Sequence, residues 1–297
     1  MRRKRTPVKQ ERTPLRQKRT PARQGQTPVR QERTPEEVRK IQLYQLEMLC
    51  EVDRICRKRH IPYSVIAGTL LGAVRHGGFI PWDDDADVAF LRPQYEAFRE
   101  AVRTELDTSR FYFQEIRDTP GYRWGYGKLR RKGTAFVREH QEHMPYEQGV
   151  FIDLFPLDAV PENRVLRTVK NAECFLVRKL LWARVGREAE QNPGKRLLYR
   201  LLDKLPQQFV FAWYGSLVKR ASRTRSRWVR ILTFPTPNRQ YGYLKRWYLQ
   251  GADTVFEGRH FRGIRDADGY LRFKFGNYWE LPPESERKQH PVSLLKL

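Results

Sequence analysis

The segment from Ile61 to Leu91 constrains the fold most, because three different hydrophobic patterns follow one another in it. IPYSVIAG (61–68) is a short β-branched run that ends in glycine, which predicts a strand and a tight turn. TLLGAVRHGG (69–78) has helical apolar spacing and two closing glycines. ADVAFL (86–91) predicts a second strand. This succession predicts a sheet whose strands are connected through helices.

The chain beyond this segment continues the alternation. PQYEAFREAVRTEL (93–106) has the apolar periodicity of a helix. Further strands are predicted at FYFQEI (111–116), TAFVRE (134–139) and GVFIDLFPL (149–157). FKFGNYWELPPESERKQHP (273–291) predicts a strand followed by an ordered loop. The expected fold class is α/β in the sense that includes α+β, with a mixed sheet flanked by helices.

The first 35 residues do not share this pattern. Thr-Pro recurs every seven residues from Thr6 to Thr34, and 12 Lys or Arg side chains stand against 2 acidic ones. A proline in every heptad removes helix hydrogen bonds, and almost no apolar surface is available to bury. We therefore expect a disordered basic tail at 1–35 and one folded domain at 36–297, with Thr34 capping the first helix and Pro35 in its first turn.

The formal net charge of +24 is concentrated in two segments. Residues 1–35 contribute +10 and residues 164–231 contribute +13, so the remainder of the chain is close to neutral. In 164–231, helical apolar spacing is interleaved with Arg, Lys and Trp, which indicates a basic helical insertion. Its helices either pack on the core with cationic outer faces or contact an anionic membrane surface. The tail is either a solvated segment without a partner or is weakly attracted to anionic lipid, nucleic acid or acidic glycan.

No run of about 18 apolar residues is present to span a bilayer, and the basic N-terminus leads into no apolar signal-peptide segment. Cys50, Cys56 and Cys174 are odd in number and lack a C-x-x-C spacing, which favours reduced thiols. We therefore expect a cytoplasmic protein, in solution or bound peripherally at the inner face of the membrane.

Asp83, Asp84, Asp85 and Asp87 are the densest group of charges in the near-neutral part of the chain. If the segment is extended, its side chains alternate, so Asp83, Asp85 and Asp87 share one face. Carboxylates placed so close together repel one another unless a cation lies between them. Mg²⁺ and Mn²⁺ prefer such oxygen ligands and keep positions open for substrate phosphates. We therefore predict a site for a divalent metal on this face.

Gly68 and Thr69 begin the helix that precedes the aspartates. A glycine lets a phosphate approach the backbone, and the N–H groups at a helix N-terminus attract anions. Asp153 lies in a later apolar strand, where an unpaired charge is costly, and it is the best-placed third carboxylate. An anion site beside a metal site indicates metal-dependent transfer at phosphorus.

Three cationic residues are candidate substrate contacts. Arg75 and His76 end the short helix, where positive charges also suit the helix dipole. Lys128 lies in the basic sequence GYGKLRRKGT, which is also typical of an exposed turn. For each of these residues the structural and the substrate-binding interpretation remain open.

Three motifs together resemble a known family: GTLLGAVRHGGFIPWDDDADVAF (68–90), GVFIDLFPLD (149–158) and FGNYWELPPESERKQHP (275–291). In that order they resemble the LicD family of phosphotransferases, which includes the fukutin-type domains. The resemblance covers about residues 36–160 and 232–292. It implies a nucleotidyltransferase-like fold and transfer of a phospho-substituent, typically phosphocholine. The donor implied is CDP-activated, and the acceptor is a hydroxyl of a cell-surface glycan or its lipid-linked precursor.

The resemblance also implies roles for individual residues. Asp85 and Asp87 would be the metal-binding pair, with Asp83 as a third ligand, and Gly68-Thr69 would be the donor-phosphate turn. Asp153 would match the later acidic strand of the family. In the mechanism that we expect from the residues, Asp153 or a neighbouring carboxylate orients or deprotonates the acceptor hydroxyl for in-line attack. The tail and the basic middle of the chain are not part of the family pattern.

Two other functions remain open from the sequence. A glycosyltransferase with a D-x-D motif also holds a nucleotide-sugar diphosphate on a metal, although the Gly-Thr turn upstream of the aspartates disfavours it. The two basic segments also suit a membrane- or nucleic-acid-binding protein without catalysis, whose affinity would fall steeply with salt. We do not expect specific nucleic-acid binding.

Overall fold

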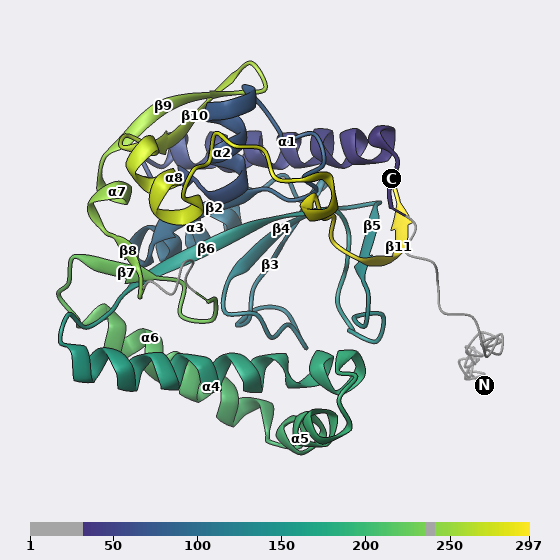
Figure 1. The fold of residues 1–297 in the computed structure, drawn as a ribbon, viewed down its shortest axis with the longest axis vertical. Coiled ribbons are helices and arrows are strands. Elements are labelled where there is room, and N and C mark those ends of the chain that lie inside the picture. Colours follow the sequence, from purple (N-terminus) through teal and green to yellow (C-terminus); the bar gives the residue numbers. More distant parts are fainter. Residues whose placement is uncertain (1–31, 236–240) are drawn as a thin grey trace, which may run out of the picture. The chain divides into compact units, whose positions relative to one another are not determined.

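A mixed sheet lies at the centre of the fold (Figure 1). The computed structural model describes residues 32–235 and 241–297, so the prediction of a disordered tail falls almost entirely outside the described residues. Five strands follow the order β1-β2-β6-β4-β3, and β7 and β8 extend the sheet from β6. The strands are β1 Ser64–Val65, β2 Asp87–Leu91, β3 Phe111–Gln114, β4 Gly127–Arg131, β6 Phe151–Ala159, β7 Trp228–Arg230 and β8 Tyr243–Leu244.

β2 and β6 are parallel, whereas the other strand pairs in the described ranges are antiparallel. The register of β2 and β6 places Asp87 opposite Asp153, and that of β4 and β6 places Lys128 opposite Asp153. The sheet therefore brings one residue from each of three strands into a single row. The predicted α/β class with a mixed sheet is confirmed.

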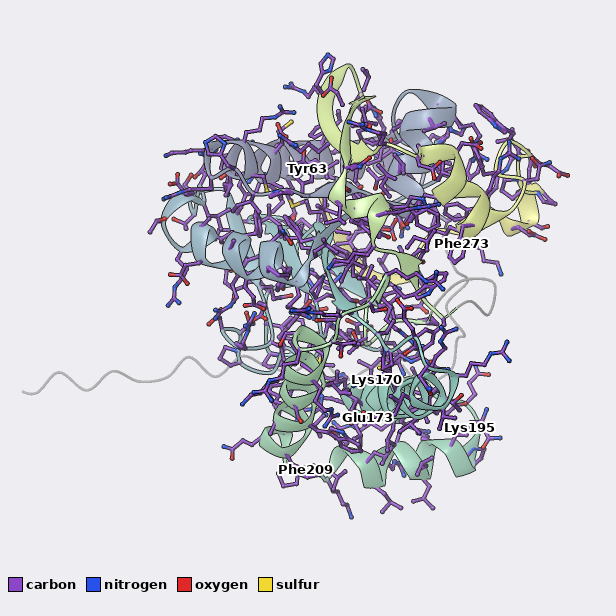
Figure 2. The ribbon with its side chains drawn as sticks, turned by 90° about the vertical axis from the view of Figure 1, so that its left-hand side faces the viewer. Tyr63, Lys170, Glu173, Lys195, Phe209 and Phe273 are labelled. Carbon is purple, nitrogen blue, oxygen red and sulfur yellow. The ribbon has the colours of Figure 1, made fainter. Side chains whose placement is uncertain are left out.

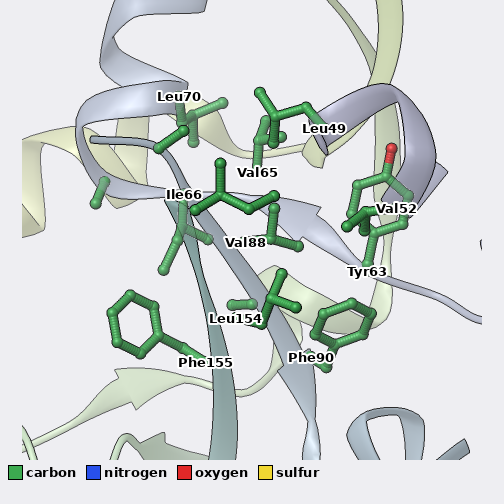
Figure 3. Packing of buried hydrophobic residues seen from close by; sticks show 14 of the residues in the cluster. Leu49, Val52, Tyr63, Val65, Ile66, Leu70, Val88, Phe90, Leu154 and Phe155 are labelled. Carbon is green, nitrogen blue, oxygen red and sulfur yellow. The ribbon is translucent and has the colours of Figure 1, made fainter. Parts of the chain in front are cut away.

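Two long helices cover one face of the sheet: α1 (Pro35–Lys58) and α3 (Arg92–Glu105). Thr34 caps α1 in a capping box with Glu37, as the sequence predicted for Thr34. The apolar side of α1 packs on the sheet, and Figure 3 shows Leu49 and Val52 close to Val88 and Leu154. α2 (Ala67–His76) connects β1 to β2 and is capped by Gly77. The φ of Gly77 is 71°, in the left-handed region that favours a residue without a side chain.

Three helices occupy most of the basic segment 164–231: α4 (Arg164–Ala189), α5 (Pro193–Asp203) and α6 (Gln207–Ser222). They lie together in Figure 1, on the side of the sheet away from α1. α4 and α6 share a second apolar cluster that includes Val177, Leu181, Val210 and Leu217. The same cluster includes Val160 and Leu232 from either side of this segment, so the helices pack on the rest of the domain.

The C-terminal part differs from the sequence-based prediction. Residues 273–275 are not a strand but the last turn of α8 (Ala267–Phe275), because Asp266 caps this helix and Tyr270 and Leu271 bury its inner side. Gly127–Arg131 is not an exposed turn but β4, because it pairs between β3 and β6. The remaining elements are β5 Ala135–Arg138, α7 Arg246–Leu249, β9 Gly251–Phe256, β10 Arg259–Ile264, a 3₁₀ turn Glu284–Glu286 and β11 Val292–Lys296.

Within the two described ranges, every helix is too short or too polar to cross a membrane. The three cysteines, all of which lie in these ranges, are free thiols as expected.

Candidate active site

The aspartate cluster lies where β2 begins. Asp83, Asp85 and Asp87 are partly exposed, whereas Asp84, Ala86 and Val88 between them are at most 2% exposed. The backbone therefore alternates through the cluster as predicted, and three carboxylates share the accessible face. Asp153 from β6 lies beside Asp87 through the parallel register.

The carboxylates on this face destabilise one another's ionised forms. Burial, followed by the charges of Asp85 and Asp84, raises the pKa of Asp83 well above its ordinary value. Burial and the charges of Asp85 and Asp153 do the same for the pKa of Asp87. Burial also raises the pKa of Asp85, although the His290 side chain opposes this shift. Such a group of acids stores electrostatic free energy that a bound cation would relieve.

Two lysines face the acids from other elements. Lys128 of β4 forms an ion pair with Asp153, and its Nζ lies 3.4 Å from the centre of the Phe151 ring. Burial lowers the pKa of Lys128 to about 8, although Asp153 opposes the shift. Burial also lowers the pKa of Lys274 of α8, against the charges of Asp87 and Asp85. Both lysines line the same cavity as Asp85, Asp87 and Asp153, whereas Asp83 is not part of its lining.

Asp84, on the buried side, has a structural role. Its carboxylate forms an ion pair with Arg33 and accepts hydrogen bonds from the backbone N–H of His290 at 3.0 Å and from the His290 ring at 2.7 Å. The other ring nitrogen of His290, Nε2, lies 3.7 Å from Asp85 Oδ2. Arg33 is thus part of the folded unit, although the sequence placed it in the tail. Residues near both ends of the described chain hold the strand that carries the acids.

A cavity of about 460 Å³ opens beside the row formed by Asp87, Asp153 and Lys128. Its lining combines acids with cationic side chains and aromatic rings. Tyr126, Phe155 and Phe234 form a cluster with ring centres 4.8 to 5.4 Å apart. The lining also includes Asp85, Arg130, Arg138, Gln148, Arg178, Lys179, Trp124, Trp182, Lys274 and His290. These groups suit a substrate that carries both charge and apolar or planar surface.

The predicted phosphate turn is close to the acids but does not line the cavity, where Ile66 and Ala67 are found instead. Thr69 is buried, and its Oγ1 accepts a hydrogen bond of 2.8 Å from the backbone N–H of Asp87. A Cβ atom on Gly68 would lie 2.6 Å from Asp83 Oδ2. The turn therefore positions the strand that carries the aspartates. Ala67, rather than Gly68, adopts a positive φ in this turn, at 50°.

Arg75 and His76 lie outside the cavity lining. Arg75 donates a hydrogen bond of 2.6 Å to the carbonyl of Tyr278, so it anchors the loop after α8. The His76 ring packs edge-on against Trp82, and burial lowers the pKa of His76. These contacts give Arg75 and His76 a structural role. Lys128, in contrast, lines the cavity, where a residue that contacts substrate must lie.

The donor atoms fit a metal that arrives with phosphate ligands. No three His, Cys, Asp or Glu side chains within residues 32–235 and 241–297 converge as a complete metal site. Mg²⁺ is commonly held by only one or two carboxylates, with waters and substrate phosphates completing its shell. The pair Asp85 and Asp87, whose pKa values are raised in the absence of a cation, matches that requirement.

Several residues of the site were not found from the sequence. Lys274, Arg33 and Arg178 are far from the aspartates in the chain and carry no motif, so only the fold brings them to the same region. The one signal in the sequence was the alternation of side chains around Asp84. It places this acid on the buried face of the strand, where a charge needs a partner.

Comparison with known proteins gives a consistent result. Residues 60–174 match the family model described as LicD/FKTN/FKRP, nucleotidyltransferase domain. The lipopolysaccharide cholinephosphotransferase LicD of Haemophilus influenzae is 27% identical over 268 residues, which cover 86% of this chain and 96% of that protein. An uncharacterized protein of Rickettsia prowazekii is 43% identical over 125 residues, or 42% of each chain. An uncharacterized protein of Rickettsia typhi is 39% identical over 66 residues, or 22% of this chain and 21% of that protein.

Proposed function

We propose that this chain is a LicD-type transferase of phosphocholine or a related phospho-substituent, because residues 60–174 match the LicD family model and the similarity to the Haemophilus enzyme covers 86% of the chain. The donor is CDP-activated, and the acceptor is a hydroxyl of a cell-surface glycan or its lipid-linked precursor. The observation that carries this proposal is the row of Asp87, Asp153 and Lys128 along one cavity, with Asp85 at its side. The name of the Haemophilus relative supports phosphocholine and lipopolysaccharide as the first candidates for group and acceptor.

In this proposal Asp85 and Asp87 hold Mg²⁺ or Mn²⁺, and Asp83 is a third ligand. A cation held by these carboxylates would supply positive charge against the donor diphosphate and would make the nucleotide monophosphate a better leaving group. The raised pKa values of all three aspartates support a cation at this position. Gly68 and Thr69 position the strand that carries these ligands.

Asp153 is the candidate base. The acceptor oxygen bonds to the phosphorus of the transferred group, the bond to the bridging diphosphate oxygen breaks, and the acceptor proton passes to Asp153 or a neighbouring carboxylate. Lys128 forms an ion pair with Asp153 and so holds its carboxylate in place at the cavity. The cationic wall of the cavity, including Arg138 and Arg178, provides contacts for further phosphate or acidic groups of either substrate.

We propose that the reaction takes place at the cytoplasmic face of a membrane, where a lipid-linked acceptor is available. The positive charge of residues 1–35 and 164–231 supports a peripheral contact with anionic lipid.

Thermal unfolding in the presence of candidate donors tests the proposed function. Wild type and Asp85→Ala/Asp87→Ala are compared with CDP-choline, CDP-ethanolamine, CDP-ribitol, CDP-glycerol and UDP-sugars, each with Mn²⁺ or with EDTA. A Tm increase of several degrees with one CDP ligand, dependent on metal and absent in the variant, is expected and identifies the donor. A shift with UDP-sugars alone would instead favour a glycosyltransferase.

A further inference from the structure

α5 and the first turn of α6 expose an unusual amount of apolar surface. Five large side chains in this short stretch are between 38% and 58% exposed: Leu197, Leu198, Leu201, Leu205 and Phe209. Leu197, Leu198 and Leu201 share one side of α5 by helical spacing. We call these five residues the α5 face. Figure 2 shows Phe209 near the lower edge of the view, beside α5. Contiguous apolar patches of this kind usually mark an interaction site.

The opposite side of α5 is firmly attached to α4. Tyr199 is the buried residue of α5, and its ring packs so closely on Gly186 that a Cβ there would lie 2.8 Å from it. Tyr199 also accepts a hydrogen bond of 2.8 Å from Lys179, and Asp203 accepts one of 2.6 Å from Arg187. Because these contacts fix the rotation of α5, the leucines are held outward by the fold.

Positive charges border the α5 face. Lys195, Arg200 and Lys204 are exposed, and their side chains form no ion pair within the described part of the chain. The acid of this stretch, Asp203, is already paired with Arg187. An apolar strip with unneutralised cations at its edges matches the boundary between the acyl chains and the headgroups of an anionic bilayer. An apolar protein partner would not require these cations.

We propose that the α5 face inserts into the headgroup boundary of an anionic lipid bilayer and so docks the enzyme on the membrane. α4, to which α5 is attached, also reaches the cavity, because Arg178, Lys179 and Trp182 of α4 line it. Docking through α5 would therefore place the cavity wall formed by α4 close to the lipid surface. This last step rests on the proposed function, since it assumes a lipid-linked acceptor, whereas the docking itself does not.

Flotation with lipid vesicles tests the docking. The full chain is mixed with vesicles of phosphatidylcholine alone or with about one third phosphatidylglycerol. The test variant is Leu197→Gln/Leu198→Gln/Leu201→Gln, because glutamine keeps the helix propensity while it removes the apolar surface. The control variant, Leu43→Gln/Leu249→Gln/Leu294→Gln, removes three leucines of similar exposure from other elements. We expect the partition coefficient on anionic vesicles to fall at least about tenfold in the test variant and to stay unchanged in the control.

Three results would overturn the proposal. The first is a wild type that does not float with anionic vesicles. The second is a test variant that floats as wild type does, which would assign the binding to the basic segments alone. A wild-type dimer in solution that becomes a monomer in the test variant would show that a second copy covers the α5 face. The proposed function is judged separately by the metal-dependent Tm shift with CDP-choline in the absence of vesicles. The test variant should retain that shift, so loss of docking and loss of donor binding are distinguishable.

Discussion

Asp87 and Asp153 lie directly opposite each other on the parallel strands β2 and β6. Parallel pairing without a bulge places equivalent side chains on the same face, so two carboxylates meet on the accessible side of the sheet. Lys128 of β4 pairs with Asp153 from the other side, whereas burial and neighbouring acids raise the pKa values of Asp87 and Asp85, against the opposing charges of Lys274 and His290. The sheet thereby separates a paired acid, suited to handling a proton, from a pair of acids suited to holding a cation.

We expect Asp87→Asn to increase stability while it abolishes activity. The raised pKa of Asp87 means that its ionised form is unfavourable in the folded state, so stability declines as the pH rises above the unfolded pKa of about 3.9. A neutral amide removes this penalty. Without metal, the free energy of unfolding at pH 7 should rise on the order of 1 kcal/mol, which corresponds to a Tm increase of about 2–4 °C. Transfer activity should fall at least about a hundredfold. A destabilised, active variant would contradict both parts.

Asp84 should respond in the opposite direction, because it is paired. Arg33→Met leaves Asp84 with only its His290 contacts, and Asp84→Asn leaves the buried Arg33 guanidinium without its carboxylate. Each should lower the free energy of unfolding by about 3–5 kcal/mol. In the double variant the loss should be clearly smaller than the sum, since neither partner is then left alone. Urea unfolding of the four proteins measures this coupling. Additive losses would show that the two side chains act independently.

Lys128 should make stability depend on pH in the alkaline range. Its pKa is about 8 in the folded protein and about 10.4 in the unfolded chain, so between these values the unfolded state binds more protons. Stability should therefore rise with pH from about 8 to about 10 in wild type relative to Lys128→Met, and the difference should be flat below pH 7. Urea unfolding of both proteins at each pH provides the comparison, in which other titrating groups cancel. A difference independent of pH would mean that Lys128 is not perturbed.

Gly68→Ala tests whether Asp83 belongs to the proposed metal site. The added Cβ would lie 2.6 Å from Asp83 Oδ2, so the carboxylate must move. We expect the Kd for Mn²⁺, measured by calorimetry, to rise about tenfold. Gly215→Ala in α6 is the matched control, because its Cβ would meet no atom within 4 Å. It should gain roughly 0.5–1 kcal/mol of stability from helix propensity and leave metal affinity unchanged. Unchanged affinity in Gly68→Ala would exclude Asp83 from the site.

Local patterns in the sequence were sufficient for most of the framework. The helix at 35–58 was predictable from its cap and apolar spacing, and β2 and β6 from their apolar runs, because these features depend on neighbours a few residues apart. The alternation of Asp83, Asp85 and Asp87 was predictable for the same reason. The strand proposed near Phe273 was wrong because a short apolar run suits a strand or a buried helix turn equally well.

Only the tertiary structure decided which of the marked residues work together. The sequence of β4 suggested an exposed turn because it is rich in Lys and Arg. These side chains can be buried in a strand because partners elsewhere in the chain stabilise them, such as Asp153 for Lys128. Arg33 and His290 meet at Asp84 although more than 250 residues separate them. The sequence by itself determined the secondary elements and the density of carboxylates, since both are local properties. Strand register and chain closure determined the site, because the energy of a buried charge depends on neighbours that no local pattern specifies.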